Sequence, residues 1–303
     1  MAGCGGPSLT PNQHATAFRS VAGASARDLL YVVIEEYPAA VDAYSYPQDQ
    51  LEGQLTGFSL PVGDCADKKG NVYIADYAAN TVIEYSHGGA KPIRTLAVPG
   101  SGSVSCAVDP AGGDLAVTVA GSTSGAGAAL AIYRPGKAKP KTYAYKPILR
   151  FAYCTYDDAG NLFVDGEPAQ GYGDNFELAE LPRDQTSLQA VTLQGGLPWS
   201  AALQWDGKYL TVGQNVRPQI LRYTIAGGDG TYVGSTPLTD SYDAMQFVIA
   251  GNKAIVVNRY YVDRYVTKWN VLVYRYPQGG YSIEDMVESS TPVGSVALSR
   301  LRK

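Results

Sequence analysis

The 303-residue chain has very little histidine, with only His14 and His87. No HExxH motif or other paired-histidine spacing occurs, which disfavours a zinc hydrolase or a histidine-dependent lyase. His87 has no serine in a nucleophile elbow nearby, which disfavours a Ser-His-Asp hydrolase. A P-loop and a GxGxxG motif are also absent. Composition therefore offers no familiar catalytic apparatus.

Charge and long apolar runs are scarce as well. Charged residues make up 17% of the chain, the formal net charge is −4, and no basic stripe stands out besides the terminal Arg300 to Lys303. This balance argues against a nucleic-acid partner. No apolar run reaches membrane-spanning length, and no stretch has a sustained helical period. With 34 glycines, the chain is expected to be rich in turns and strands.

What the sequence does have is a repeat. A Gly-Asn turn followed by a β-branched and aromatic strand opens the unit Gly70-Asn-Val-Tyr-Ile-Ala-Asp76. Similar units begin at Gly113, Gly160, Gly207 and Gly251, at intervals of 43 to 47 residues. A period in the forties with about four strands per unit is typical of a β-propeller.

These units resemble NHL repeats, in which Gly-x-Ala-Val-Asp on an inner strand precedes Gly-Asn-x-Tyr-Val-Ala-Asp. Ser105-Cys-Ala-Val-Asp109 and Gly70 to Asp76 carry the pattern best. The resemblance covers most of residues 60–260 and implies a propeller fold, but it says little about activity, because propellers host many chemistries.

The two ends of the repeat array complement each other. Leu29 to Glu35 is a strand that lacks an inner strand before it, and Pro292 to Leu298 is an inner strand with nothing after it. We predict that residues 293–299 complete the first blade of a six-bladed, all-β propeller of four-stranded antiparallel blades over residues 28–303, closing the ring and removing its free edges.

Residues 1–27 are expected to lie outside this domain as a leader remnant and tether. Met1-Ala-Gly-Cys4 resembles the end of a bacterial lipoprotein signal peptide, which implies lipidation of Cys4 and an extracytoplasmic location. The alternative is an ordinary cytoplasmic start with a chance cysteine. The residues that follow are small and polar, as in a flexible tether.

Three further cysteines lie in predicted inner strands. Cys106 and Cys154 stand three residues before an aspartate, whereas Cys65 stands two before one, so Cys65 faces the other side of its strand. A disulfide between Cys65 and Cys106 in adjacent blades is therefore predicted, with Cys154 as a buried thiol. The alternative is three small buried hydrophobic residues.

The ends of the second strands are expected to surround the mouth of the propeller. In gluconolactonase-like propellers a Glu, an Asp and Asn residues there hold a cation, and Glu35, Asp165 and Asn258 resemble that set. The resemblance implies a calcium site and a metal-dependent hydrolase or lactonase. The alternative is ordinary solvation of strand ends.

Aromatic and cationic residues gather in the same predicted loops. Such residues suit a sugar, peptide or glycan, although a β-extension whose side chains cover one another is equally compatible with the pattern. The candidate ligand-binding residues are Tyr172, Trp199, Arg217, Tyr260, Tyr261 and Arg264, with Phe151 nearby. The favoured function is a monomeric, extracytoplasmic binding or scaffold propeller without catalysis, which engages a protein, glycan or small molecule at its mouth and meets a membrane only through a lipid on Cys4.

Overall fold

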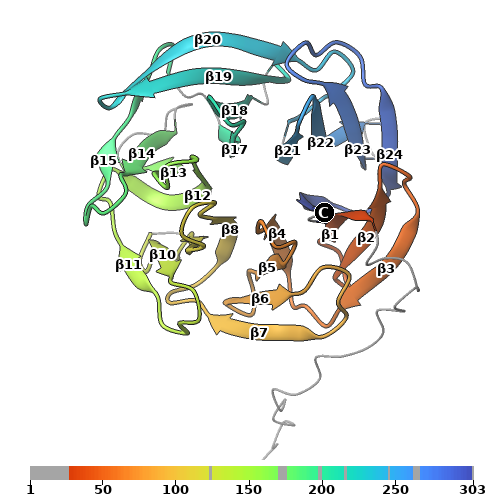
Figure 1. Cartoon of the computed structure of the whole chain (residues 1–303), viewed down its shortest axis with the longest axis horizontal. Helices are drawn as coiled ribbons and strands as arrows, with labels where there is room; N and C mark the ends of the chain where they lie inside the picture. The colour runs from red at the N-terminus through yellow and green to blue at the C-terminus, as the bar shows by residue number, and fades with distance from the viewer. Residues whose placement is uncertain are drawn as a thin grey trace, which may run out of the picture.

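A computed structural model describes residues 27–122, 125–169, 176–196, 200–214, 217–244, 246–261 and 267–301. Six sheets stand in a ring around a central axis (Figure 1), which confirms the predicted six-bladed propeller. Among the described residues, no helix is long and apolar enough to cross a membrane.

The first three blades follow the predicted boundaries closely. From the axis outward, blade 1 consists of β25 (Val293–Ser299), β1 (Asp28–Ile34), β2 (Ala40–Tyr46) and β3 (Leu51–Thr56). Blade 2 consists of β4 (Pro61–Ala66), β5 (Val72–Asp76), β6 (Thr81–Tyr85) and β7 (Pro92–Ala97). Blade 3 consists of β8 (Ser103–Val108), β9 (Leu115–Val119), β10 (Ala129–Tyr133) and β11 (Lys141–Tyr143).

The last three blades are less uniform. Blade 4 consists of β12 (Ile148–Tyr156), β13 (Leu162–Pro168), β14 (Glu177–Leu181) and β15 (Gln189–Ala190). Blade 5 consists of β17 (Ser200–Trp205), β18 (Leu210–Gln214), β19 (Gln219–Ala226), β20 (Asp229–Pro237) and a fifth strand, β16 (Thr192–Leu193), parallel to β20. Blade 6 consists of β21 (Gln246–Ala250), β22 (Lys253–Tyr261), β23 (Thr267–Arg275) and β24 (Glu284–Ser289).

Ring closure occurs where the sequence predicts it. β25 pairs antiparallel with β1, from Leu29 opposite Ser299 to Ile34 opposite Val293. His87, in the turn after β6, contacts both ends of the closure: Nδ1 lies 2.6 Å from Ser299 Oγ, and Nε2 lies 2.8 Å from the Arg27 carbonyl oxygen. The innermost strand of blade 1 thus comes from the other end of the chain.

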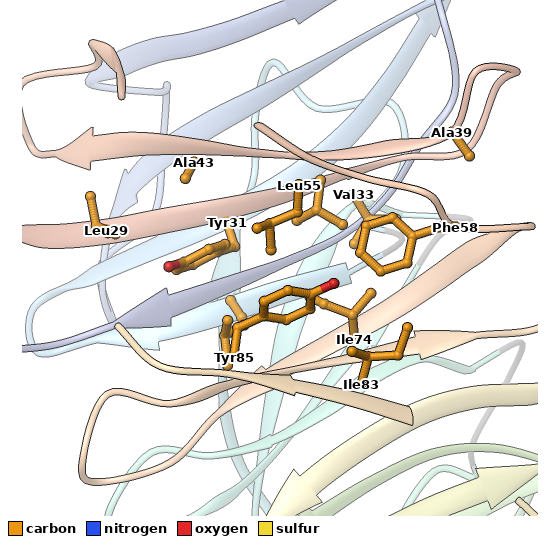
Figure 2. Close-up of a cluster of buried hydrophobic side chains, with 13 residues drawn as sticks. Leu29, Tyr31, Val33, Ala39, Ala43, Leu55, Phe58, Ile74, Ile83 and Tyr85 are labelled. Carbon is orange, nitrogen blue, oxygen red and sulfur yellow. The ribbon is translucent and has the colours of Figure 1, made fainter. Parts of the chain in front are cut away.

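The core is divided among the contacts between blades. The described residues form six buried clusters, each shared by two neighbouring blades. Figure 2 shows the cluster between blades 1 and 2, where Tyr31 and Phe58 face Ile74 and Tyr85. Because both faces of a blade are covered, all five residues of β5 are buried. This two-sided burial explains why the second strands are largely apolar instead of alternating.

A disulfide joins blades 2 and 3. Cys65 on β4 and Cys106 on β8 are bonded, with their Cα atoms 5.7 Å apart. This is the pairing that the offset of one residue predicts. Cys154 on β12 is a buried free thiol, and burial raises its pKa.

Candidate binding site at the mouth of the propeller

Strand direction gives the ring two different faces. We call one the mouth face; it carries the connections from second to third strands and from outer strands to the next inner strand. The other, which we call the rear face, carries the turns from first to second and from third to fourth strands. Among the described residues, the exposed tyrosines on the mouth face are Tyr37, Tyr242 and Tyr261.

Two of these tyrosines form a pair over blade 6. Tyr242 lies in the connection that leads into β21, and Tyr261 ends β22. Their ring centroids are 5.4 Å apart with the planes at 73°, an edge-to-face arrangement. The side chains remain 61% and 48% exposed, so a large part of each ring is available to a ligand.

The loop that carries Tyr242 is held from below by a buried amide. Asn258 Oδ1 accepts hydrogen bonds from the backbone N–H of Tyr242 at 2.7 Å, the N–H of Asp243 at 3.3 Å and the hydroxyl of Ser241 at 2.9 Å. Its Nδ2 donates to Asn270 Oδ1 at 2.9 Å. Since Asn258 is 1% exposed, this interaction network fixes the loop in place.

A second clamp lies beside the tyrosines. Arg259 Nε donates to Asp243 Oδ2 at 2.8 Å, and its Nη2 lies 2.6 Å from the same oxygen. The guanidinium carbon lies 5.7 Å from the ring centroid of Tyr261, within cation–π range. Tyr242, Asp243, Arg259 and Tyr261 together are called the tyrosine clamp below. They form a pre-organised surface of aromatic, cationic and acidic groups.

Nearer the axis, burial and the charges of two carboxyl groups raise the pKa of a tyrosine. Asp165 Oδ1 accepts a hydrogen bond from the Tyr153 N–H at 2.8 Å. Burial raises the pKa of Tyr153, and the charges of Asp165 and Glu35 raise it further. Burial also raises the pKa of Glu35 and of Asp165. The Glu35 carboxylate lies against Gly294 of β25, where a β-carbon would collide with it.

The predicted cation ligands do not share one position in the repeat. Aligned through the register of second and third strands, Asp165, Asn258 and Glu35 occupy three successive positions of the second strand, so Asn258 faces away from the other two. Its Oδ1 already accepts from three donors. Within the described ranges, no group of three or more His, Cys, Asp or Glu side chains could hold a metal ion.

The remaining predicted binding residues divide into two groups. Tyr172, Trp199 and Arg264 lie outside the described residues. Arg217 is exposed on the mouth face, and Tyr261 belongs to the tyrosine clamp. Tyr260 instead donates its hydroxyl to Glu288 Oε1 at 3.2 Å on the outer strand β24, so it takes part in a β-extension in which β22 and β23 pair as far as Tyr261 and Thr267.

Sequence reasoning missed Tyr242 and the link from Arg259 to Asp243. The signal available was the segment Thr239-Asp-Ser-Tyr-Asp243, a polar run with one aromatic residue between an outer and an inner strand. Connections of this kind carry function more often than the strands they join.

Neither a protein-family model nor a curated protein matches the chain. Solved structures do resemble it. The nidogen propeller of a nidogen/laminin complex superposes with a TM-score of 0.63 at 12% identity, covering 91% of this chain and 100% of that one. A protein of unknown function from Bacteroides caccae gives a TM-score of 0.65 at 13% identity, covering 90% and 99%. At such identities the likeness establishes the propeller fold alone.

Proposed function

We propose that the chain is an extracytoplasmic, non-catalytic propeller that binds a protein partner through the tyrosine clamp at its mouth. The observation that carries the proposal is the exposed pair Tyr242–Tyr261 held by Asn258 and Arg259. A glycan or small ligand is the other kind of occupant that such an aromatic surface accepts.

The clamp has the composition of an interface hot spot. Tyrosine and arginine dominate the residues whose truncation weakens protein complexes most. The Asn258 hydrogen bonds and the Arg259–Asp243 ion pair hold the loop before any partner arrives, which lowers the ordering cost of binding. A nidogen propeller in a complex with laminin supports partner binding as a use of this fold.

An exported location is supported by the Cys65–Cys106 disulfide, since such bonds persist mainly outside the reducing cytosol. We further propose that the protein is a monomer of the NHL-repeat type and that acylation of Cys4 anchors it to the cell envelope. Mass spectrometry of the protein from its native membrane fraction tests the anchor, because two or three acyl chains on Cys4 add a mass that an unmodified cysteine lacks.

The partner proposal is tested by a matched pair of variants. Tyr242→Ala/Tyr261→Ala removes the clamp rings, and Tyr281→Ala removes a 71% exposed tyrosine of the turn between β23 and β24, which is not part of the clamp. Each protein is immobilised and exposed to an envelope extract, and the captured proteins are quantified. We expect a protein that is retained by the wild type and by Tyr281→Ala but not by the double variant.

The captured partner is then purified and titrated directly. Loss of two hot-spot rings should weaken its Kd by about 30-fold or more. An unchanged Kd, or an equal loss with Tyr281→Ala, would contradict the proposal.

The second candidate is a metal-dependent hydrolase or lactonase. It is favoured by the grouping of Glu35, Asp165 and Tyr153 near the axis, where burial raises the pKa of all three groups. Thermal melts with calcium and with a chelator, combined with a glucono-lactone hydrolysis assay, separate the two candidates. A melting shift with calcium and hydrolysis lost in Glu35→Gln would favour the enzyme.

A further inference from the structure

A groove lies on the rear face, remote from the tyrosine clamp. It has a volume of about 660 Å³ and runs between blades 3 and 4, from the turn after β10 to the turn after β14. This size falls within the range of small-ligand sites.

One wall of the groove is cationic. The residues that line it are Arg134, Lys137, Lys139 and Lys141, which run from the residue after β10 to the first residue of β11. Within the described part of the chain none of them makes an ion pair. Unpaired cations at this density stand out in a chain with a net charge of −4. The groove is therefore suited to a ligand with several negative charges.

The base of the groove holds polar groups without protein partners. Tyr156 ends the inner strand of blade 4 and is 8% exposed, and its buried hydroxyl makes no hydrogen bond to any described residue. Burial raises the pKa of this hydroxyl, and the nearby charges of Asp114 and Asp109 raise it further, which places Tyr156 beside the acids that line the groove. A buried hydroxyl without a partner is costly, and a ligand that bonds it removes that cost.

Two acids complete the base. Asp109 Oδ1 and Oδ2 accept the N–H groups of Ala111 and Gly112 within their own turn. No hydrogen bond is formed by the Asp114 carboxylate within the described residues, and its pKa is raised by burial and by Asp109 despite the nearby Arg134 and Arg183. The ligand must therefore supply hydroxyl donors to the base as well as anionic groups to the wall.

We propose that this groove binds an acidic oligosaccharide, whose carboxylates meet the hairpin cations and whose hydroxyls bond Asp114 and Tyr156. A phosphopeptide or inorganic polyanion would satisfy the lysines but would place like charges against Asp109 and Asp114. Tyr143 also lines the groove, and Lys141 Nζ lies 4.7 Å from its ring centroid, a cation–π contact that holds this cation at the wall.

The probe is tetragalacturonate, titrated into the full chain by calorimetry at low and moderate salt. Its fully methyl-esterified form has the same backbone and secondary hydroxyls but no charge. We expect the acid to bind at least about ten-fold more tightly than the ester, because charge-assisted hydrogen bonds to the wall are lost in the ester.

Two variants identify the groove, and a third is the control. Arg134→Gln/Lys137→Gln should weaken binding of the acid by about ten-fold or more. Tyr156→Phe removes only the unpartnered hydroxyl, so we expect weaker binding with an unchanged or higher melting temperature. Lys208→Gln removes another exposed cation, in the turn before β18, and should change neither.

Three results would overturn the proposal: no binding of tetragalacturonate to the wild type, equal binding of the methyl ester, or equal losses in all variants including Lys208→Gln. Tighter binding of inorganic polyphosphate than of the sugar would also overturn it, since that would mark a non-selective cationic surface.

Discussion

The ring is held by two joints of different chemistry. Between blades 2 and 3 the inner strands are covalently linked through Cys65 and Cys106. Blade 1, where the ends of the chain meet, depends on backbone pairing between β25 and β1, on His87, and on a buried bond of 2.7 Å from Ser295 Oγ to Asp64 Oδ1. The covalent link thus does not lie where the ring closes.

This difference indicates how each joint should fail. A disulfide stabilises mainly by restricting the unfolded chain, so breaking it leaves every native contact except the S–S bond in place. The closure is made of native contacts alone, and its buried hydrogen bond from Ser295 ends on an ionisable carboxyl, that of Asp64. We therefore expect the closure to be the larger contribution and the one sensitive to pH.

Deleting residues 290–303 should have the largest effect. It removes β25, whose Val293, Val296 and Leu298 are buried, and it exposes the edge of β1. The expected loss in the free energy of unfolding exceeds about 5 kcal/mol, comparable with the whole stability of many domains. Urea unfolding monitored by circular dichroism measures it, with deletion of residues 302–303 as the control.

A truncated protein that unfolds at the same urea concentration as the full chain would show that the closure contributes little, and the comparison between the two joints would then be reversed.

Removing the disulfide should have the second largest effect. Cys65→Ala/Cys106→Ala releases a loop with a sequence separation of 41 residues, and the expected cost is about 2–4 kcal/mol. Urea unfolding with and without a reductant measures this cost. The reductant should lower the wild-type midpoint and leave the variant unchanged, because the remaining described cysteine, Cys154, is a free thiol.

Of the three variants, substitution of the ionisable carboxyl at the closure, Asp64, should give the smallest effect. Burial raises the pKa of Asp64 from 3.8 to about 7, against the lowering effect of the Ser295 hydrogen bond. A carboxyl whose pKa is higher in the folded than in the unfolded protein makes its full contribution to stability at pH values below its unfolded pKa. That contribution is lost as the pH rises through its folded pKa. Stability attributable to Asp64 should therefore fall between about pH 4 and pH 7.

Asp64→Asn keeps the shape but cannot ionise, so its stability relative to the wild type should rise across the same pH window. At pH 8 we expect the variant to have a free energy of unfolding about 1–2 kcal/mol higher than the wild type. The amide avoids the cost of a buried charge, but part of this gain is offset because its N–H donors lie where Asp64 Oδ2 has no described partner. A difference between the two proteins that does not change with pH would contradict the assignment.

Most of the fold could be predicted from the sequence because the blades repeat a similar pattern of turn and strand residues. Turn glycines and largely apolar second strands mark five of the six blades, and the unpaired strands at the two ends define the first blade and the closure. The fifth strand of blade 5, Thr192–Leu193, was not predicted, since two residues have no detectable period and the parallel partner is distant in sequence.

The site was less predictable, for a physical reason. An asparagine at the end of a strand has the same sequence signature whether it ligates an ion, meets solvent or holds a loop. The role of Asn258 depends on the backbone of residues 241–243, which folding alone brings together with it. The cationic hairpin of residues 134–141 was missed because Gly, Ala and Pro separate its charges.

Both ends of the described chain leave from the rear face. Asp28 Oδ1 accepts a hydrogen bond from the Leu301 N–H at 2.8 Å, so the two exits are neighbours, and the mouth lies at the opposite side of the disc. Any tether or fusion attached through either exit would present the tyrosine clamp outward and keep the groove between blades 3 and 4 on the side of the attachment. The orientation of the molecule on a support is thereby built into the way its ring is closed.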